Sequence, residues 1–308
     1  MASRKLGPEF TYDLSEFRRV DPDLIHYEQS AAVGTGLKEP RGIAVGPEDR
    51  LYVAGDRAVR VFGSDGRAAG DWATQMDPRC VAVAPAGTVY VAAADHVEAF
   101  AADGRRETAW KPAGQPSLIT GLAAADGDVF ASDAAACAVW HYSAAGELLG
   151  RIDGRPAPAA AAKDAGGPGF IVPSPYFDVA VGPAGVLLVA NPGRRRVELY
   201  TYDGIFKSSW GAASFKIEGF CGCCNPTHLS ALPGGRIVTS EKGLPRVKVY
   251  APEGRLASVV APPAAFDEAA AGLDVAADSA GRIWVLDPLA RQVRLFTRKK
   301  TAPAEAKP

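Results

Sequence analysis

Short apolar runs of four or five residues recur between turn residues through most of this chain. Within residues 40–67 they read GIAV, LYVA and AVRVF, and a further run, AAGDW, follows the Ser-Asp-Gly turn at 64–66. Runs that are rich in β-branched and aromatic residues and end at Gly, Pro or Asp are typical of strands joined by tight turns. The pattern therefore predicts four short strands in succession.

The same arrangement is repeated at residues 78–105, 120–146, 177–204, 228–254 and 274–296. Self-similarity at a spacing of roughly 40–50 residues, with four strands per unit, is the sequence signature of a β-propeller. We therefore predict an all-β fold, a six-bladed β-propeller with four antiparallel strands per blade, over residues 24–297. The blades are expected at roughly 40–77, 78–118, 119–153, 175–211, 226–261 and 272–297.

The sixth blade contains only three predicted strands before the chain becomes polar. Residues 24–32 (LIHYEQSAA) can form one more strand, and we expect it to complete the last blade at its outer edge. Such a closure leaves no long strand edge unpaired at the seam of the ring. Residues 1–23 are interpreted as an N-terminal extension or a cloning scar, and residues 298–308 as a disordered tail.

The repeat resembles that of the NHL-repeat propellers. PRGIAV at 40–45, YVAGD at 52–56 and VRVFGSDG at 59–66 carry the resemblance, which extends over residues 24–297. It implies the propeller fold but no single function, because NHL propellers include lyases, carbohydrate or RNA readers and protein scaffolds. The three-histidine zinc site of peptidyl-amidoglycolate lyases is not reproduced, and neither is the calcium set of gluconolactonase-like propellers. Family members are often exported, which favours a periplasmic location.

Composition argues against some partners but does not exclude a local basic patch. The net charge of −1 provides no field for nucleic acid or an anionic membrane, and no apolar run is long enough to span a bilayer. We expect a monomer with no nucleic-acid partner. The sequence also lacks a glycine-rich phosphate loop and a nucleophile elbow.

The sharpest local signal is CGCCNPTH at residues 221–228. Thiolates and imidazole are ligands for zinc, copper(I) or an iron–sulfur cluster, and Cys221, Cys223, Cys224 and His228 are the predicted ligand set. Two alternatives stay open: a redox-active disulfide such as Cys221–Cys223 or Cys223–Cys224, and packing without chemistry.

Aligned blades place Gly42, Cys80, Gly121, Asp178, His228 and Asp274 at the starts of the inner strands, around the channel mouth. Asp178, His228 and Asp274 lie on consecutive blades and are candidate acid–base catalysts; alternatively, they hydrogen-bond neighbouring strand ends. Arg41 and Arg79 are candidates to clamp a substrate carboxylate or phosphate, and the alternative is pairing with Asp56 and Asp95. The residues that end the second strands are expected to cap turns: Asp56, Asp95, Asp133, Asn191, Glu241 and Asp287.

Two long insertions, at 154–173 and 211–225, are expected on the face that carries the mouth, where extra loop length indicates function. The leading hypothesis is a metal-binding propeller that acts in electron transfer, metal handling or redox catalysis. An interaction scaffold that binds a partner protein across the insertion-bearing face is the alternative. A small-molecule lyase or hydrolase at the mouth is the third.

Overall fold

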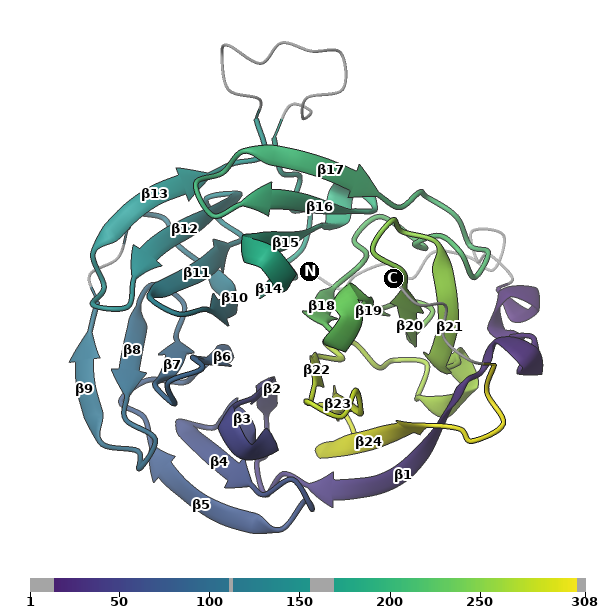
Figure 1. Cartoon of the computed structure of the whole chain (residues 1–308), viewed down its shortest axis with the longest axis horizontal. Coiled ribbons are helices and arrows are strands. Elements are labelled where there is room, and N and C mark those ends of the chain that lie inside the picture. Colours follow the sequence, from purple (N-terminus) through teal and green to yellow (C-terminus); the bar gives the residue numbers. More distant parts are fainter. Residues whose placement is uncertain (1–13, 111–112, 156–168, 304–308) are drawn as a thin grey trace, which may run out of the picture.

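The computed structural model describes residues 14–110, 113–155 and 169–303 and forms a ring of six four-stranded antiparallel sheets (Figure 1). The predicted all-β six-bladed propeller is confirmed, and the described residues contain no α-helix. Parts of the predicted N-terminal extension (residues 1–13), the first insertion (156–168) and the predicted tail (304–308) lie outside the described residues.

Each blade runs outward from the channel in chain order. The inner strands are β2 (Pro40–Val45), β6 (Cys80–Val83), β10 (Ile119–Ala124), β14 (Val179–Val181), β18 (His228–Ala231) and β22 (Val275–Ala277). The second strands are β3 (Leu51–Gly55), β7 (Val89–Ala92), β11 (Asp128–Asp133), β15 (Val186–Asn191), β19 (Ile237–Glu241) and β23 (Ile283–Asp287). The third strands are β4 (Ala58–Phe62), β8 (Val97–Phe100), β12 (Ala138–Ser143), β16 (Arg196–Thr201), β20 (Arg246–Tyr250) and β24 (Gln292–Arg298). The outer strands are β5 (Ala68–Ala73), β9 (Arg106–Ala109), β13 (Leu148–Ile152), β17 (Phe206–Trp210) and β21 (Leu256–Ala261), and β1 (Tyr27–Gly34) serves the sixth blade.

The core lies between blades, on both faces of the second strands. The large residues that align across the repeats are all buried there: Tyr52, Tyr90, Phe130, Leu188, Val238 and Trp284. A strand that is buried on both faces needs a continuous apolar run, which explains why LYVA, VYVA and IWVL do not alternate. The outer strands β5 and β9 are largely exposed and carry small or polar residues in place of large aliphatic ones.

Tryptophans at the ends of outer strands lock neighbouring blades together. Trp72, Trp110 and Trp210 pack on Gly104, Gly146 and Gly254 of the next blade, where a Cβ atom would lie only 2.2–2.7 Å from the indole. These glycines also have φ between +86° and +87°, a conformation that L side chains rarely adopt. Glycine is therefore required at these turns by both the backbone and the neighbouring blade.

The ring closes as predicted, through β1 at the outer edge of the sixth sheet. β1 pairs antiparallel with β24, from Tyr27 opposite Arg298 to Gly34 opposite Gln292. The preceding residues cover β21, because Ile25 forms a bridge to Val259, and this explains why β21 is more buried than the other outer strands. β24 ends at Arg298, one residue beyond the predicted blade.

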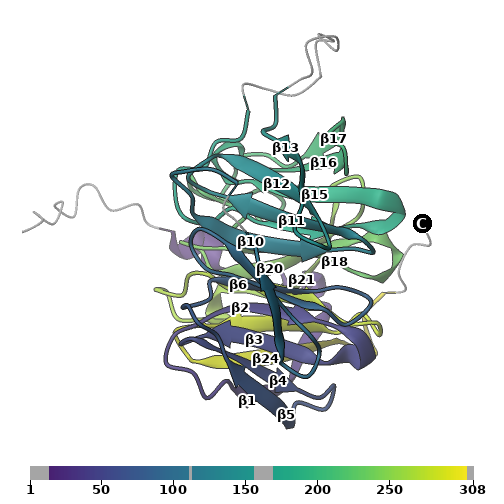
Figure 2. The ribbon, with the colours of Figure 1, turned by 90° about the vertical axis from the view of Figure 1, so that its left-hand side faces the viewer.

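The remaining elements are single 3₁₀ turns: η2 (Ser15–Arg18), η3 (Pro22–Leu24), η4 (Pro47–Asp49), η5 (Pro183–Gly185), η6 (Pro192–Arg194), η7 (Pro233–Gly235) and η8 (Pro263–Ala265). In edge view the blades stack around a common axis, and the C-terminal end of the described chain lies on the side opposite η2 (Figure 2). Within the described residues no helix is long and apolar enough to cross a membrane.

The residues that end the second strands bind the loop arriving from the preceding blade. Asp56, Asp133, Asn191 and Glu241 accept backbone N–H groups of Glu39, Leu118, Ile171 and Cys221, at 3.0, 2.9, 3.1 and 2.8 Å. Asp133 and Asp287 also cap their own turns, as predicted. The repeated acid or amide therefore fixes the inter-blade loops, which carry the candidate functional residues.

Candidate functional site

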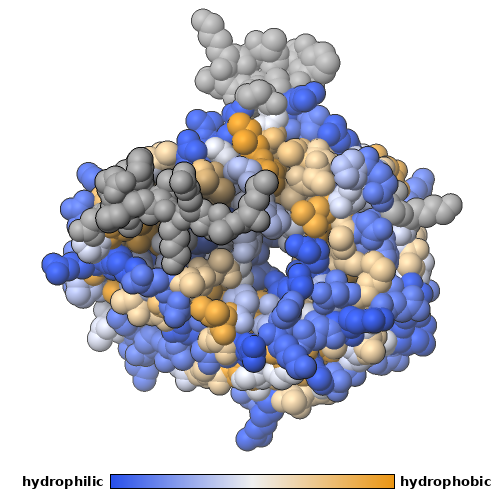
Figure 3. All heavy atoms as spheres, turned by 180° about the vertical axis from the view of Figure 1, so that it is seen from behind, coloured by the Kyte–Doolittle hydropathy of each residue, from blue (hydrophilic) through white to orange (hydrophobic). Residues whose placement is uncertain are grey.

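The mouth of the central channel is the principal cavity that the inner strands and inter-blade loops form. Figure 3 shows this face, with an opening at its centre bordered largely by hydrophilic residues. A cavity of about 200 Å³ is lined by Arg41, Arg79, Thr120, Tyr176 and His228, among others. A second cavity of about 190 Å³ continues into the channel past Cys80, Asp178 and Asp274 and shares Arg41, Arg79, Thr120 and His228 with the first. The structure thus gathers both predicted arginines and the predicted histidine at one place.

The two arginines differ in their partners. Arg41 Nη2 donates to Glu39 Oε2 at 2.9 Å and lies 3.1 Å from Asp77 Oδ2. The half-buried Arg79 guanidinium makes no hydrogen bond or ion pair with any residue of the described chain. The alternative pairing with Asp56 and Asp95 is wrong, because those carboxylates accept from the Glu39 backbone N–H and the His96 ring.

His228 is the first residue of β18 and is buried at the wall of this cavity. The Tyr176 ring meets it edge-on, with centroids 5.8 Å apart, and its Nδ1 has no hydrogen-bond partner among the described residues. Burial lowers the pKa of His228 to about 4, so the ring is neutral at pH 7. A neutral imidazole offers one donor and one acceptor nitrogen to a bound molecule.

Asp178 and Asp274 form the floor of the mouth and join blades. Asp178 Oδ2 accepts the Leu229 N–H at 2.9 Å, and Asp274 Oδ2 accepts the Ile43 N–H at 2.7 Å. Both carboxylates therefore bind the ends of strands in a neighbouring blade, which is the structural role that the sequence offered as the alternative to acid–base catalysis. Burial raises the pKa of both carboxyls, that of Asp274 to about 7, and the charge of Asp274 adds to the rise for Asp178. Their role as catalysts stays a prediction.

The cysteine motif is spread over the end of the 211–225 loop. Cys223 Sγ and Cys224 Sγ lie 3.0 Å apart, whereas Cys221 Sγ lies 3.6 Å from the Lys242 carbonyl oxygen. Among the residues that the structure describes, no group of three His, Cys, Asp or Glu side chains is placed to hold a metal ion. The predicted ligands Cys221, Cys223, Cys224 and His228 are therefore not assembled into one site in this conformation, and metal binding stays a prediction.

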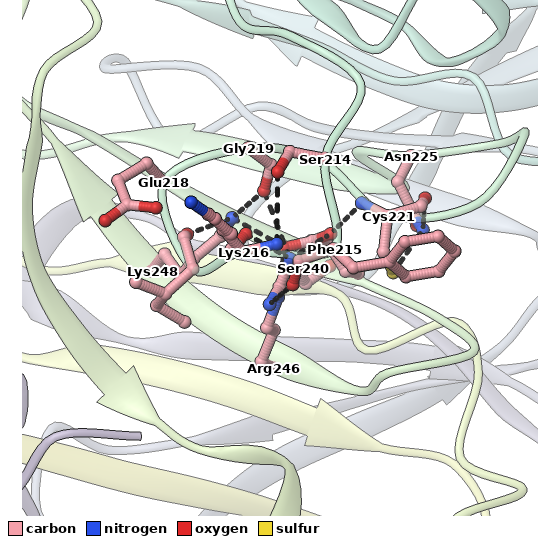
Figure 4. Close-up of polar contacts among 12 residues, drawn as sticks. Ser214, Phe215, Lys216, Glu218, Gly219, Cys221, Asn225, Ser240, Arg246 and Lys248 are labelled. Atoms are coloured by element: carbon pink, nitrogen blue, oxygen red, sulfur yellow. Dashed lines mark hydrogen bonds and ion pairs between the residues drawn. The ribbon is translucent and has the colours of Figure 1, made fainter. Parts of the chain in front are cut away.

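A buried charge network that the sequence analysis missed holds this loop (Figure 4). Glu241 Oε1 lies 2.7 Å from both Arg246 Nε and Lys248 Nζ, and all three side chains are buried. Arg246 donates to the carbonyls of Phe215 and Gly219, at 3.2 and 3.1 Å. The sequence did contain a signal for this network. The RVKVY segment that forms β20 carries two cations, Arg246 and Lys248, in a strand that is expected to be apolar.

Comparisons with known proteins support the fold and no closer relationship. No family model matches the chain, so the NHL resemblance is not confirmed as membership, and no curated protein matches it. A streptogramin B lyase aligns with a TM-score of 0.60 and 11% identity over 91% of this chain and 100% of its own. A catalytically inactive virginiamycin B lyase from Staphylococcus aureus, with quinupristin, aligns with a TM-score of 0.59 and 12% identity over 89% of this chain. The WD40 propeller domain of Doa1 gives a TM-score of 0.57 and 15% identity over 90% of this chain and 99% of its own.

Proposed function

We propose that this propeller binds a small anionic molecule, a carboxylate or a phosphate ester, at the channel mouth. The observation that carries the proposal is the Arg79 guanidinium, which has no partner in the described chain and lines the same cavity as the unpartnered Nδ1 of His228. A buried polar atom such as His228 Nδ1 normally has a partner, because leaving it unsatisfied costs free energy, and the half-buried Arg79 lines the same cavity. A bound anion would supply the missing partners.

The surroundings favour an anion over a cation. Arg41 is held in place by Glu39 and Asp77, next to Arg79 on the neighbouring blade. His228 is neutral at pH 7, and the raised pKa values of Asp178 and Asp274 reduce the negative charge below the mouth. Glu39 and Asp77 do not line the cavity, whereas both arginines do. Two guanidinium groups match the planar, bidentate geometry of a carboxylate or phosphate.

The size of the cavity favours a small ligand. Even together with the cavity of about 190 Å³ that continues it, the cavity of about 200 Å³ at the mouth lies near the lower end of the roughly 300–1,000 Å³ that is usual for drug-sized molecules. Thr120 Oγ1 donates to the Phe177 carbonyl at 2.7 Å, so its lone pairs remain to accept a ligand hydroxyl or N–H. We therefore expect a ligand with one acidic group and a short polar body.

The proposal is tested by titration calorimetry with lactate and with inorganic phosphate as probes. Replacing Arg79 by Gln should weaken the better probe roughly 10- to 150-fold, since a hydrogen bond to a charged group contributes about 1.5–3 kcal/mol. Arg67→Gln is the matched control, because Arg67 is exposed on a turn of the first blade. Equal affinities in Arg79→Gln, Arg67→Gln and wild type would contradict the proposal.

The metal hypothesis for Cys221, Cys223, Cys224 and His228 ranks second. The short distance between the Cys223 and Cys224 sulfurs favours it, and the lack of a third converging ligand in the described chain weighs against it. Metal analysis of anaerobically purified protein tests it directly. A scaffold role receives no particular support, since propellers similar in fold include a lyase as well as a WD40 domain.

A further inference from the structure

Two adjacent thiols face each other near the end of the 211–225 loop. Cys223 Sγ and Cys224 Sγ are 3.0 Å apart, and both cysteines are free. A disulfide bond is about 2.05 Å long, so the sulfurs need to approach by only about 1 Å. Cys223 is exposed and Cys224 is buried, which gives the pair one sulfur that meets reagents and one that is shielded.

The third cysteine of the motif is held apart from this pair. The thiol of Cys221 contacts the Lys242 carbonyl oxygen at 3.6 Å and the Asn225 Nδ2 at 3.4 Å. The geometry thereby selects Cys223–Cys224 over Cys221–Cys223.

Hydrogen bonds hold the chain on both sides of the pair. The Cys221 N–H donates to Glu241 Oε2 at 2.8 Å. The Asn225 side chain donates to the Cys221 carbonyl and accepts from the Lys242 N–H, at 2.7 and 2.9 Å. Gly222, with φ +65°, would place a Cβ no closer than 4.0 Å to any neighbour, so the backbone next to Cys223 is not crowded.

We propose that Cys223 and Cys224 form a thiol modification site that reacts with small disulfides and closes to a vicinal disulfide. In the first step the Cys223 sulfur attacks the small disulfide, forms a mixed disulfide and releases one small thiol. The Cys224 sulfur then attacks the Cys223 sulfur and releases the second small thiol. The two protein thiols are oxidised, the small disulfide is reduced to two thiols, and the two protons leave with them. This site is independent of anion binding at the mouth.

The test uses the full chain, reduced, treated with chelator, desalted and then exposed to oxidised glutathione. Wild type should retain three of its five thiols, with a mass loss of two hydrogens located between residues 223 and 224 and reversed by dithiothreitol. Cys221→Ser is the control and should form the same bond. Cys224→Ser should stop at one glutathione adduct on Cys223, and Cys223→Ser should react far more slowly because Cys224 is buried.

Several results would overturn the proposal. Wild type that keeps all five thiols, that stops at a stable glutathione adduct, or whose disulfide includes Cys221 contradicts the assignment of the pair. Zinc or copper(I) that stays bound to these cysteines despite the chelator, and thereby prevents the disulfide from forming, also contradicts the proposal. The sulfurs would then be metal ligands.

Discussion

The Glu241–Arg246–Lys248 network of blade five and the channel mouth both contain polar side chains shielded from water, but the charges of the network are paired, whereas two groups at the mouth are not. Glu241 is within 2.7 Å of two cations, and Arg246 and Lys248 also donate to carbonyls of the 211–225 loop. At the mouth, the Arg79 guanidinium and His228 Nδ1 have no partner in the described chain. The two regions are neighbours, since His228 follows the loop that Arg246 holds.

The difference separates a structural role from a binding role. A buried charge that is fully hydrogen-bonded fixes a local conformation, whereas an unpaired polar group is costly and is retained where function requires it. The network of blade five therefore explains the conformation of the 211–225 loop. The unpaired groups of the mouth mark the place where we propose that a ligand binds. Substitutions in the two regions should accordingly have opposite consequences.

The largest effect is expected from Glu241→Gln. It removes the anion between two buried cations, and breaking a buried pair in this way costs about 3–5 kcal/mol. Denaturant unfolding, followed by circular dichroism, measures the loss in free energy of unfolding. Glu253→Gln, at an exposed pair with Arg255, should change it by less than about 1 kcal/mol. A loss below about 1 kcal/mol in Glu241→Gln would show that the network does not stabilise the fold.

A smaller effect is expected from Arg246→Lys, which keeps the charge but loses the guanidinium bonds to Phe215, Lys216 and Gly219. We expect a loss of about 1–3 kcal/mol and faster tryptic cleavage after Lys216 under native conditions. Arg255→Lys, at an exposed site, controls for the substitution itself. If Lys216 is cleaved at the wild-type rate in Arg246→Lys, the network does not hold the loop.

The pH dependence of stability probes the floor of the mouth. Burial raises the pKa of Asp274 from 3.8 to about 7, so between these values the folded protein binds more protons than the unfolded chain. Stability from this group is therefore present at low pH and falls as pH rises through that window, by at most about 1.4 kcal/mol per pH unit.

Asp274→Asn should remove this decrease in the free energy of unfolding. The difference in free energy of unfolding between wild type and variant should therefore change steadily between about pH 4 and pH 7. His228 acts in the opposite sense, because burial lowers its pKa from 6.5 to about 4 and its contribution rises with pH between those values. Comparing each variant with wild type separates the two groups. Parallel pH profiles for Asp274→Asn and wild type would contradict the assignment.

The smallest effect is expected from Arg79→Met without ligand. Since the guanidinium has no partner in the described chain, its loss should leave the free energy of unfolding within about 0.5 kcal/mol of wild type or raise it. Chemical denaturation of the ligand-free protein provides the measurement. A loss of more than about 2 kcal/mol would place Arg79 with the structural charges of blade five.

The fold was predictable because its signals are local and repeated. The aligned core residues from Tyr52 to Trp284 and the closing strand near Tyr27 follow from apolar runs and turns alone. The gathering of Arg41, Arg79 and His228 at the mouth also followed, because equivalent positions in repeats lie around one axis.

The ion pairs that involve loop residues were not predictable in the same way. Arg41 pairs with Glu39 and Asp77 rather than Asp56, because Asp56 already accepts backbone N–H groups. Glu241 looked like another turn cap, and its pairing with Arg246 and Lys248 depends on where a long loop folds back. Such contacts depend on loop conformation, about which a repeat pattern carries no information.

The central claim, that the unpaired groups at the mouth bind an anion, is tested most directly by anomalous scattering from crystals soaked in selenate. This tetrahedral oxyanion should give a peak within hydrogen-bond distance of the Arg79 guanidinium and on the side of His228 in wild type. The peak should be absent in Arg79→Gln crystals that are soaked identically. Selenate that binds only at exposed arginines such as Arg67, or that occupies the mouth equally in both proteins, would contradict the account.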